Sequence, residues 1–314
     1  MRNIITIDIG ASKIRFMAVK DNKEVTEYLD TPTVDLVGRE LKNSNLVKIL
    51  TDNISRLRHN IQTEGDTVSA ISIGSPGSLD PVRGVILNPP NLKGIRNLAI
   101  VDELKDIFKL PVFLLNDADA ALLGEHWLRS NRESENIIYL TLSTGVGSGI
   151  LKRGELLNEK VELGHQPITI EGKRKRCSCG ELNHVEAYLG TKGLAEIYTE
   201  IFEIKKSLTS GEQYSTSSKM RKGVADLDPK WLLVQARYAK YLAIFLRNIF
   251  LNFRPELVIL GGGIIFENAS LFSKTRYELE RITSKGEVTK IELALSGKNV
   301  NLGVAKYALE QLEN

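Results

Sequence analysis

The chain has 314 residues, of which 42% are hydrophobic, so it is long enough to bury the cores of two domains. Its 42 basic and 39 acidic residues are spread along the sequence, and the formal net charge of +3 argues neither for a nucleic-acid partner nor for a membrane surface, so we expect neither. No apolar run approaches the roughly 18 residues of a membrane span, and the first residues lead straight into a predicted strand, so we expect a cytoplasmic protein without a signal peptide.

Residues 2–20, RNIITIDIGASKIRFMAVK, alternate β-branched and polar residues around a Gly-Ala-Ser turn, which predicts a β-hairpin. The turn follows Asp8 and contains Gly10, Ser12 and Lys13. Backbone N–H groups and a hydroxyl there can converge on an anion, beside a carboxylate that can hold Mg²⁺ through water. Many tight turns carry the same residues without a ligand, so this motif alone favours a plain turn.

Residues 38–62 carry leucine and isoleucine at helical spacing, which predicts a helix packed on a core. A buried strand then ends at residues 74–77, GSPG, and a short hairpin closes at residues 88–91, NPPN. Proline restricts such a loop and glycine permits close backbone approach, so the segment can line a ligand site. A loop without any function would look the same.

Residues 111–117, PVFLLND, predict an apolar strand that ends in Asn116 and Asp117, and a helix over 118–129 follows. Carboxylates at the C-terminal end of a strand in an open α/β sheet lie where such sheets place their chemistry. Asp117 is also well placed to be the N-cap of the helix. We favour the catalytic interpretation because of the motifs that follow.

A second strand over residues 137–142 runs into the turn 143–149, STGVGSG, and another strand. This arrangement repeats that of residues 2–20 and is the strongest indication of the fold. Two hairpins that close over phosphates are typical of a duplicated actin-like or sugar-kinase ATP clamp, whereas the Walker G-x-x-x-x-G-K-[ST] pattern is absent. We therefore expect a nucleotide to lie between two lobes.

The chain has two cysteines and four histidines, and both cysteines and two of the histidines lie within residues 162–188. Two thiolates and two imidazoles form a set that tetrahedral Zn²⁺ favours, and four protein ligands indicate a structural ion. Glu162 and Glu186 lie among them and suit sugar hydroxyls better than zinc. The alternative is an ordinary turn with a surface histidine. The candidate ligands are His165, Cys177, Cys179 and His184.

The polar residues 207–222 predict a helix pair or a loop with no recognisable chemistry. Asp228 and Pro229 then form the N-cap and first turn of a long predicted helix, whose apolar stripe we interpret as core and not as a cofactor site. The stripe consists of Trp231, Tyr238, Leu242, Phe245, Ile249 and Phe253.

Near the end of the chain, a predicted strand over residues 256–260 ends in three glycines at 261–263. Three small residues allow a nucleotide base or ribose to lie against the backbone. A helix over 303–312 completes the chain, and we expect it to pack back on the first lobe.

Taken in order, these segments resemble the ROK family of repressors, open reading frames and sugar kinases. The resemblance rests on DIGASKIR, GSPG with NPPN, LLND, TLSTGVGSGI, ELGH, CSCG with VEAY, and LGGGI, and it covers nearly the whole chain. It implies an α/β, two-lobed actin-like ATPase (ribonuclease H-like) fold with ATP and sugar in the interlobe cleft. We expect a small lobe of residues 1–117 plus 301–314 and a large lobe of residues 118–300 that holds the zinc loop and the nucleotide site.

The resemblance also implies a kinase that transfers the γ-phosphoryl group of ATP to a hexose hydroxyl, usually the 6-hydroxyl, with Mg²⁺ and a structural Zn²⁺. Asp117 then corresponds to the general base. The corresponding sugar ligands are Gly74, Ser75, Asn91, Asn116, Asp117, Glu162, His165 and Glu186. The corresponding nucleotide residues are Asp8, Gly10, Ser12, Lys13, Thr144, Gly145, Gly147, Gly261, Gly262 and Gly263.

Two positions depart from the family pattern. The family's zinc motif is C-x-C-G-x-x-G-C-x-E, and here Asn183 and His184 replace the Gly-Cys pair. The first phosphate motif has Gly-Ala-Ser at residues 10–12 where Gly-Gly-Thr is common, which keeps the hydroxyl. His165 can serve both zinc and sugar, because one ring nitrogen can bind the metal while the other donates to a hydroxyl.

Several alternatives stay open within this resemblance. A repressor, or a sugar sensor without kinase activity, is disfavoured because the first phosphate strand begins at residue 2 and Asp117 is present. An actin-like ATPase that acts on no sugar is disfavoured by ELGH and CSCG. The VEAY motif favours an N-acetylhexosamine (N-acetylglucosamine or N-acetylmannosamine) as substrate, and a glucokinase or broad hexokinase is the alternative. The resemblance also suggests a homodimer or homotetramer.

Overall fold

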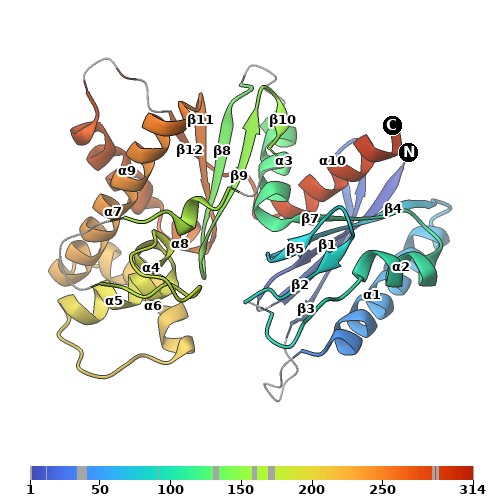
Figure 1. Ribbon diagram of the computed structural model, residues 1–314, viewed down its shortest axis with the longest axis horizontal. Helices are drawn as coiled ribbons and strands as arrows, with labels where there is room; N and C mark the ends of the chain where they lie inside the picture. The colour runs from blue at the N-terminus through green and yellow to red at the C-terminus, as the bar shows by residue number, and fades with distance from the viewer. Residues whose placement is uncertain are drawn as a thin grey trace. The chain divides into compact units, whose positions relative to one another are not determined.

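The computed structural model describes residues 2–11, 13–33, 41–90, 92–129, 134–157, 161–168, 174–284, 287 and 290–313. The chain divides into two compact units, Met1–Asn131 with Leu295–Asn314, and Arg132–Ala294. Each unit contains a five-stranded sheet with helices packed on it (Figure 1).

The sheet of the first unit has the strand order β3-β2-β1-β4-β7. β1, β2 and β3 pair antiparallel, whereas β4 and β7 extend the sheet in parallel from β1. The predicted hairpin over residues 2–20 is therefore confirmed. The strands are β1 (Asn3–Ile9), β2 (Lys13–Lys20), β3 (Val25–Pro32), β4 (Val68–Ser75) and β7 (Val112–Asn116), and a small separate hairpin is formed by β5 (Leu79–Asp80) and β6 (Val85–Ile86).

Helices cover both faces of this sheet, which explains why β1 is buried along its whole length. Ile5 and Ile7 of β1 pack with α1 and α2, whereas Ile4 packs with α10 on the opposite face. β1 is not a continuous apolar run, because it carries Asn3, Thr6 and Asp8 between its isoleucines. These buried polar side chains are hydrogen-bonded, to the Thr67 carbonyl, the Met17 carbonyl and Arg15 respectively. The helices of the first unit are α1 (Asn43–Thr63), α2 (Ile100–Phe108), α3 (Asp117–Arg129) and α10 (Asn299–Glu313).

α3 belongs to the first unit because it packs closely on α10 (Figure 1). A Cβ at Gly303 would lie 1.6 Å from the Ala120 carbonyl oxygen, and one at Gly124 would lie 2.0 Å from the Asn299 carbonyl oxygen. The division predicted from the sequence placed α3 and the start of α10 in the large lobe. The predicted division differs from the observed one because the α3–α10 contact is made by the backbone at two glycines, and hydrophobic periodicity does not reveal such a contact.

A buried carboxylate fixes the point where the chain re-enters the first unit. Glu125 of α3 is fully buried, and its carboxylate accepts hydrogen bonds from the Leu295 N–H at 2.9 and 3.0 Å and from the Ser296 N–H at 3.3 Å. Arg129 lies 3.5 Å away, one helical turn further on, and balances the charge. The start of α10 is thus tied to α3 by paired polar groups, which a buried charge requires.

The sheet of the second unit has the order β10-β9-β8-β11-β12 and repeats the first arrangement. β8 and β9 form an antiparallel hairpin, and β11 and β12 continue the sheet in parallel from β8. The predicted repeat of a strand-turn-strand unit is confirmed. The strands are β8 (Ile137–Leu142), β9 (Val146–Lys152), β10 (Glu155–Leu156), β11 (Leu257–Gly261) and β12 (Ile291–Leu293).

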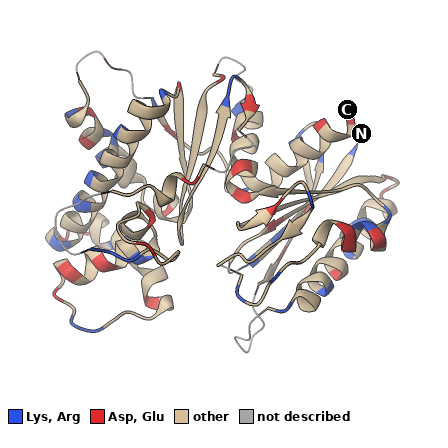
Figure 2. Ribbon diagram, viewed as in Figure 1, with Lys and Arg blue, Asp and Glu red and all other residues tan. Residues whose placement is uncertain are grey.

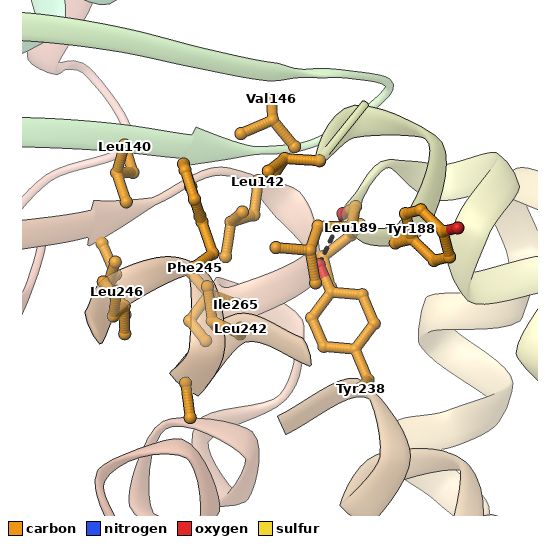
Figure 3. Close-up of a cluster of buried hydrophobic side chains, with 14 of the residues drawn as sticks. Leu140, Leu142, Val146, Tyr188, Leu189, Tyr238, Leu242, Phe245, Leu246 and Ile265 are labelled. Atoms are coloured by element: carbon orange, nitrogen blue, oxygen red, sulfur yellow. Dashed lines mark hydrogen bonds between the residues drawn. The ribbon is translucent and has the colours of Figure 1, made fainter. Parts of the chain in front are cut away.

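α7 forms the central helix of the second core. Asp228 caps it by accepting from the Lys230 and Trp231 N–H groups, as predicted. Tyr238 is buried within the cluster of Figure 3 and donates its hydroxyl to the Leu189 carbonyl at 2.6 Å, which anchors the end of α4. The helices of this unit are η1 (Leu163–His165), α4 (Glu186–Leu189), α5 (Thr191–Ile201), α6 (Ser210–Ala225), α7 (Pro229–Phe253), α8 (Gly263–Glu267) and α9 (Ala269–Ile282).

Two expectations for this unit need correction. Phe253 is 38% exposed and does not continue the buried stripe of α7, because the helix ends there. The polar segment 207–222 contributes a single helix, α6, and not a helix pair or a loop. Thr209 and Glu212 form a capping box that begins α6, a signal that was present in the sequence.

Basic and acidic residues are interspersed over the helices of both units, whereas the strands β4, β7, β8 and β11 contain none (Figure 2). Among the described residues, no helix combines the length and the apolar character that a membrane crossing needs.

Gly303→Ala should lower the free energy of unfolding by about 1–3 kcal/mol, because its new Cβ meets the backbone of α3 and the helices must separate. The matched control is Gly211→Ala in α6, where a Cβ meets nothing within 4 Å. That control should leave stability unchanged or raise it by up to about 1 kcal/mol. Urea denaturation measures both, and equal stability of the two variants would contradict the proposed contact.

Candidate active site and metal site

Predicted site residues meet at the carboxyl ends of three neighbouring parallel strands of the first unit. Asp8 of β1 pairs with Gly74 of β4, and Ser75 of β4 pairs with Asn116 of β7. Asp117 follows at the first position of α3. The sheet register therefore brings these five residues to one edge, the place where open α/β sheets carry ligand sites.

Asn116, and not Asp117 as the sequence allowed, is the N-cap residue of α3. Its Oδ1 accepts from the Ala118 N–H at 2.9 Å and from the Asp119 N–H at 3.4 Å. Asp117 Oδ1 also accepts from the Ala118 N–H, at 2.8 Å. Because Oδ1 of Asn116 is committed to the helix, a ligand hydroxyl at this residue would accept from its Nδ2 amide.

Gly74 and Ser75 have evident packing roles. A Cβ at Gly74 would lie 2.6 Å from Cγ1 of Val300, so its small size lets β4 approach α10. Ser75 is fully buried, and its hydroxyl donates to the Pro76 carbonyl at 3.3 Å. Any contact of these two residues with a ligand would thus come mainly from their backbone. Asn91, the other candidate from this region, lies outside the described residues.

The first glycine turn is held by its own backbone. The Gly10 N–H donates to the Lys13 carbonyl at 3.0 Å, and a Cβ at Gly10 would lie 2.8 Å from that oxygen. The Lys13 ammonium pairs with Asp30 at 3.2 Å, with both side chains nearly half exposed. Ser12 lies outside the described residues.

Asp8 is buried and forms an ion pair that the sequence analysis did not predict. Arg15 donates from Nη1 to Asp8 Oδ2 at 2.6 Å. Burial raises the pKa of Asp8 above its ordinary value, although the Arg15 charge opposes the shift. The signal was available, because Asp8 and Arg15 pair across the predicted hairpin.

The second glycine turn lies against Glu186. The Ser143 N–H donates to the Gly145 carbonyl at 3.0 Å, and a Cβ at Gly145 would lie 2.3 Å from Glu186 Oε2. The Val146 N–H donates to that same oxygen at 3.3 Å. Glycine is therefore needed at 145 for the carboxylate to reach the turn. Gly147 continues into β9, where it pairs with Thr141.

Thr144, at the tip of this turn, contacts a residue that the sequence analysis missed. Its hydroxyl lies 3.2 Å from the hydroxyl of Tyr214, which is half exposed on α6. α6 is held beside α8 by a hydrogen bond from Asn268 Nδ2 to Ser217 Oγ at 2.9 Å. The segment that the sequence left without chemistry thus reaches the predicted phosphate turn.

The three glycines between the end of β11 and the start of α8, Gly261 to Gly263, are not equivalent. A Cβ at Gly261 would lie 2.1 Å from the Tyr139 hydroxyl, and one at Gly262, whose φ is +92°, would lie 2.4 Å from the Leu142 carbonyl oxygen. Both are required for packing on β8. Gly263 has open space at its Cβ position, so a ligand near this turn would approach Gly263.

Three of the four predicted zinc ligands come together in the second unit. One ligand atom from each of His165, Cys177 and Cys179 lies within 4.8 Å of the other two. His184 is buried beside them, with its Nδ1 3.3 Å from Cys179 Sγ and its ring stacked on that of His165 at 5.2 Å. Imidazole and thiolate donors at this proximity suit Zn²⁺.

Short backbone contacts assemble this cluster. Pro167 and His184 form an isolated antiparallel bridge, in which Ile168 N–H donates to the Asn183 carbonyl at 2.7 Å. Asn183 has a φ of +61°, and its Oδ1 accepts from the Lys175 N–H at 3.1 Å and from the Tyr188 hydroxyl at 3.0 Å. The bridge brings the two histidine-bearing segments side by side.

Glu186 joins the metal cluster to the glycine turn. Its Oε1 accepts from the Ser178 hydroxyl and from the Cys177 thiol, the latter at 3.4 Å. Burial, followed by smaller effects that include the Glu186 charge, raises the pKa of the Cys177 thiol to about 11. A thiol with this pKa is protonated at neutral pH, and a bound metal would displace its proton. Glu162, the other candidate carboxylate, is exposed just before η1.

Comparison with known proteins gives a consistent result. A model of the ROK family matches residues 4–305. A glucokinase of Thermotoga maritima is 28% identical over 292 residues, which cover 87% of this chain and 86% of that protein. An N-acetyl-D-glucosamine kinase of Vibrio atlanticus is 26% identical over 272 residues, which cover 82% of this chain and 83% of that protein.

The fold has a close counterpart among solved structures. The crystal structure of a ROK hexokinase from Thermus thermophilus matches with a TM-score of 0.80 at 27% identity, over 99% of this chain and 100% of that chain. The predicted α/β, actin-like ATPase fold is confirmed by this likeness and by the two five-stranded sheets.

Asp8→Asn should stabilise the protein, and increasingly so as the pH rises. Because the pKa of Asp8 is raised in the folded state, above its ordinary value of 3.8 the unfolded chain loses the proton first. Wild-type stability therefore falls as pH rises from there through the folded pKa, and the asparagine variant escapes this loss. Urea denaturation from about pH 4 to about pH 8 measures the difference. If the difference in the free energy of unfolding between the two proteins is independent of pH, or shrinks with rising pH, the pKa of Asp8 is not raised by burial in the folded state.

Proposed function

Because the chain belongs to the ROK family, we propose that it is an ATP-dependent sugar kinase that transfers the γ-phosphoryl group to the 6-hydroxyl of a hexose. The observation that carries the proposal is the edge of the first sheet, where Asp8 lies on β1, Asn116 on β7 and Asp117 directly after β7, with the parallel strand β4 between β1 and β7. A carboxylate at such an edge is placed to act on a bound ligand.

In the proposed reaction Asp117 accepts the proton of the 6-hydroxyl, whose oxygen then attacks the γ-phosphorus. The bond to the bridging oxygen breaks, and ADP leaves with the electron pair. Phosphoryl transfer has a loose transition state, so positioning and charge neutralisation matter more than covalent chemistry. A single carboxylate suffices for the proton. The proposed ligands of the other sugar hydroxyls are Gly74, Ser75, Asn91, Asn116, Glu162, His165 and Glu186.

The phosphates of ATP are proposed to lie against the two glycine turns, and the adenosine against the turn at Gly263. Backbone N–H groups in such glycine turns suit a phosphate. The missing side chains of Gly10 and Gly145 themselves make room for the Lys13 carbonyl and the Glu186 carboxylate. Mg²⁺ would neutralise phosphate charge, with Asp8 as the proposed carboxylate that holds its water. Arg15 forms an ion pair with Asp8, and this pairing limits the affinity of the Asp8 carboxylate for Mg²⁺.

A structural zinc ion is proposed to bind His165, Cys177, Cys179 and His184. The clustering of imidazole and thiol donors supports this set. The ion's contribution would be to hold the turn that carries Cys177 and Ser178, both of which contact the carboxylate of Glu186 at the start of α4. His165 would then be fixed in one tautomer, ready to donate to a sugar hydroxyl.

The hexose is proposed to be an N-acetylhexosamine, with glucose as the alternative. The VEAY segment around Glu186 favours the first, whereas the Thermotoga relative named a glucokinase favours the second. A pocket separates such ligands by only a few kcal/mol unless a polar group is left unpaired. Relative kcat/KM for N-acetylglucosamine, N-acetylmannosamine and glucose decides between them.

Asp117→Asn should lower kcat by about 10²–10⁴-fold, because the amide keeps the shape and loses the base. Sugar affinity should stay within about tenfold of wild type. ADP release and equilibrium sugar binding measure the two quantities. The matched control is Asp106→Asn on α2, where the side chain is 88% exposed, and it should retain full turnover. Undiminished turnover in Asp117→Asn would remove this residue from the mechanism.

Purified protein should contain about one zinc ion per chain, and His165→Ala should lose most of it. His59→Ala, which removes an exposed histidine of α1, is the control and should keep its zinc. Mass spectrometry of the metal content provides the measurement. Folded, active protein without zinc would refute the metal site and leave the kinase proposal standing.

A further inference from the structure

His184 stands where the related zinc motif has a cysteine, and its surroundings show how an imidazole can take that place. The ring is buried, and both nitrogens have partners. Nδ1 lies 3.3 Å from Cys179 Sγ, on the side of the metal cluster, and Nε2 lies 3.0 Å from Glu181 Oε2. Cys179 thus contacts one ring nitrogen of His184 and Glu181 contacts the other.

An imidazole needs such a partner in a way that a thiolate does not. A neutral histidine has two tautomers, and only the one protonated at Nε2 leaves the Nδ1 lone pair for a metal. A carboxylate that accepts from Nε2–H selects this tautomer, fixes the ring plane and raises the basicity of Nδ1. We propose that Glu181 is the positioning residue that makes His184 a zinc ligand through Nδ1.

The loop around Glu181 is organised to hold that carboxylate in place. The Cys177 N–H donates to the Glu181 carbonyl at 2.8 Å, and Arg176 donates to the Gly180 carbonyl at 2.7 Å. Gly180 has a φ of +101°, a conformation that glycine adopts without strain. The same turn therefore places Cys177 and Cys179 beside His165, and the Glu181 carboxylate at Nε2 of His184.

His184 is itself fixed by the backbone on its other side. The bridge with Pro167 and the Val185 N–H bond to the Gln166 carbonyl, at 3.0 Å, hold its main chain. Stacking on His165, with the ring planes 19° apart, limits rotation of the side chain. These contacts fix the position of the ring but not its tautomer. The Glu181 carboxylate selects the tautomer by accepting from Nε2–H.

The expected size of the effect follows from exposure. The Glu181 side chain is 77% exposed, so water competes for its carboxylate. Loss of a group that orients a metal-binding histidine costs about 10–100-fold in metal affinity, and an exposed one belongs at the low end of that range. We expect about a tenfold loss of zinc affinity for Glu181→Gln.

The test measures zinc dissociation constants of the full chain by competition with a chromophoric chelator. The proteins are wild type, Glu181→Gln, His184→Cys and the double variant. In the histidine background Glu181→Gln should weaken zinc binding about tenfold. In the cysteine background it should have no effect, because a thiolate has no second nitrogen to orient. Glu155→Gln, an exposed glutamate of β10, is the charge-matched control and should bind like wild type.

An equal effect of Glu181→Gln in both backgrounds would overturn the proposal, since it would show a general charge effect or direct ligation by Glu181. An unchanged zinc affinity in the histidine background would also overturn it. The inference rests on the proposed zinc site, and wild-type protein that binds no zinc would refute both. Phosphoryl transfer is measured separately and can survive each of these outcomes.

Discussion

The parallel pairing of β1, β4 and β7 is the constraint on which the candidate active site depends. Side chains that are far apart in the sequence reach one edge because Asp8 pairs with Gly74, and Ser75 with Asn116. The same pairing requires Gly74 to be small, because α10 packs against β4 at Val300. The packing of α10 on β4 and the geometry of the site both require glycine at position 74, so a side chain there would disturb both.

In the second unit the candidate residues lie on turns and at the ends of short helices, such as His165 at the end of η1 and Glu186 at the start of α4. A loop holds a carboxylate only when its backbone is fixed, and here the fixing comes from the bridge between Pro167 and His184, from the end of α4 anchored by Tyr238, and from the contact of Glu186 with the turn at Gly145. A metal ion among the cysteine and histidine donors would complete a scaffold that is already partly formed by protein hydrogen bonds.

The sequence predicted most of the elements, because hydrophobic period and caps are local. The Asp228 cap and the buried Tyr238 of α7 are examples. It did not predict features that arise from contacts between distant segments. Glu125 binds the backbone at Leu295, and Tyr214 reaches the turn at Thr144, and no local pattern marks either contact. Glycine motifs were also ambiguous in function. Packing on β8 accounts for Gly261 and Gly262 without any nucleotide.

The most direct test of the central claim is the fate of the γ-phosphate of ATP. Purified protein, ATP, Mg²⁺ and, in turn, each of N-acetylglucosamine, N-acetylmannosamine, mannose and glucose are incubated together, and the products are identified by phosphorus NMR. The proposed kinase activity should yield a hexose 6-phosphate and an equal amount of ADP with at least one of these sugars. Folded protein that forms no sugar phosphate with any of them, or that releases inorganic phosphate without regard to sugar, would contradict it.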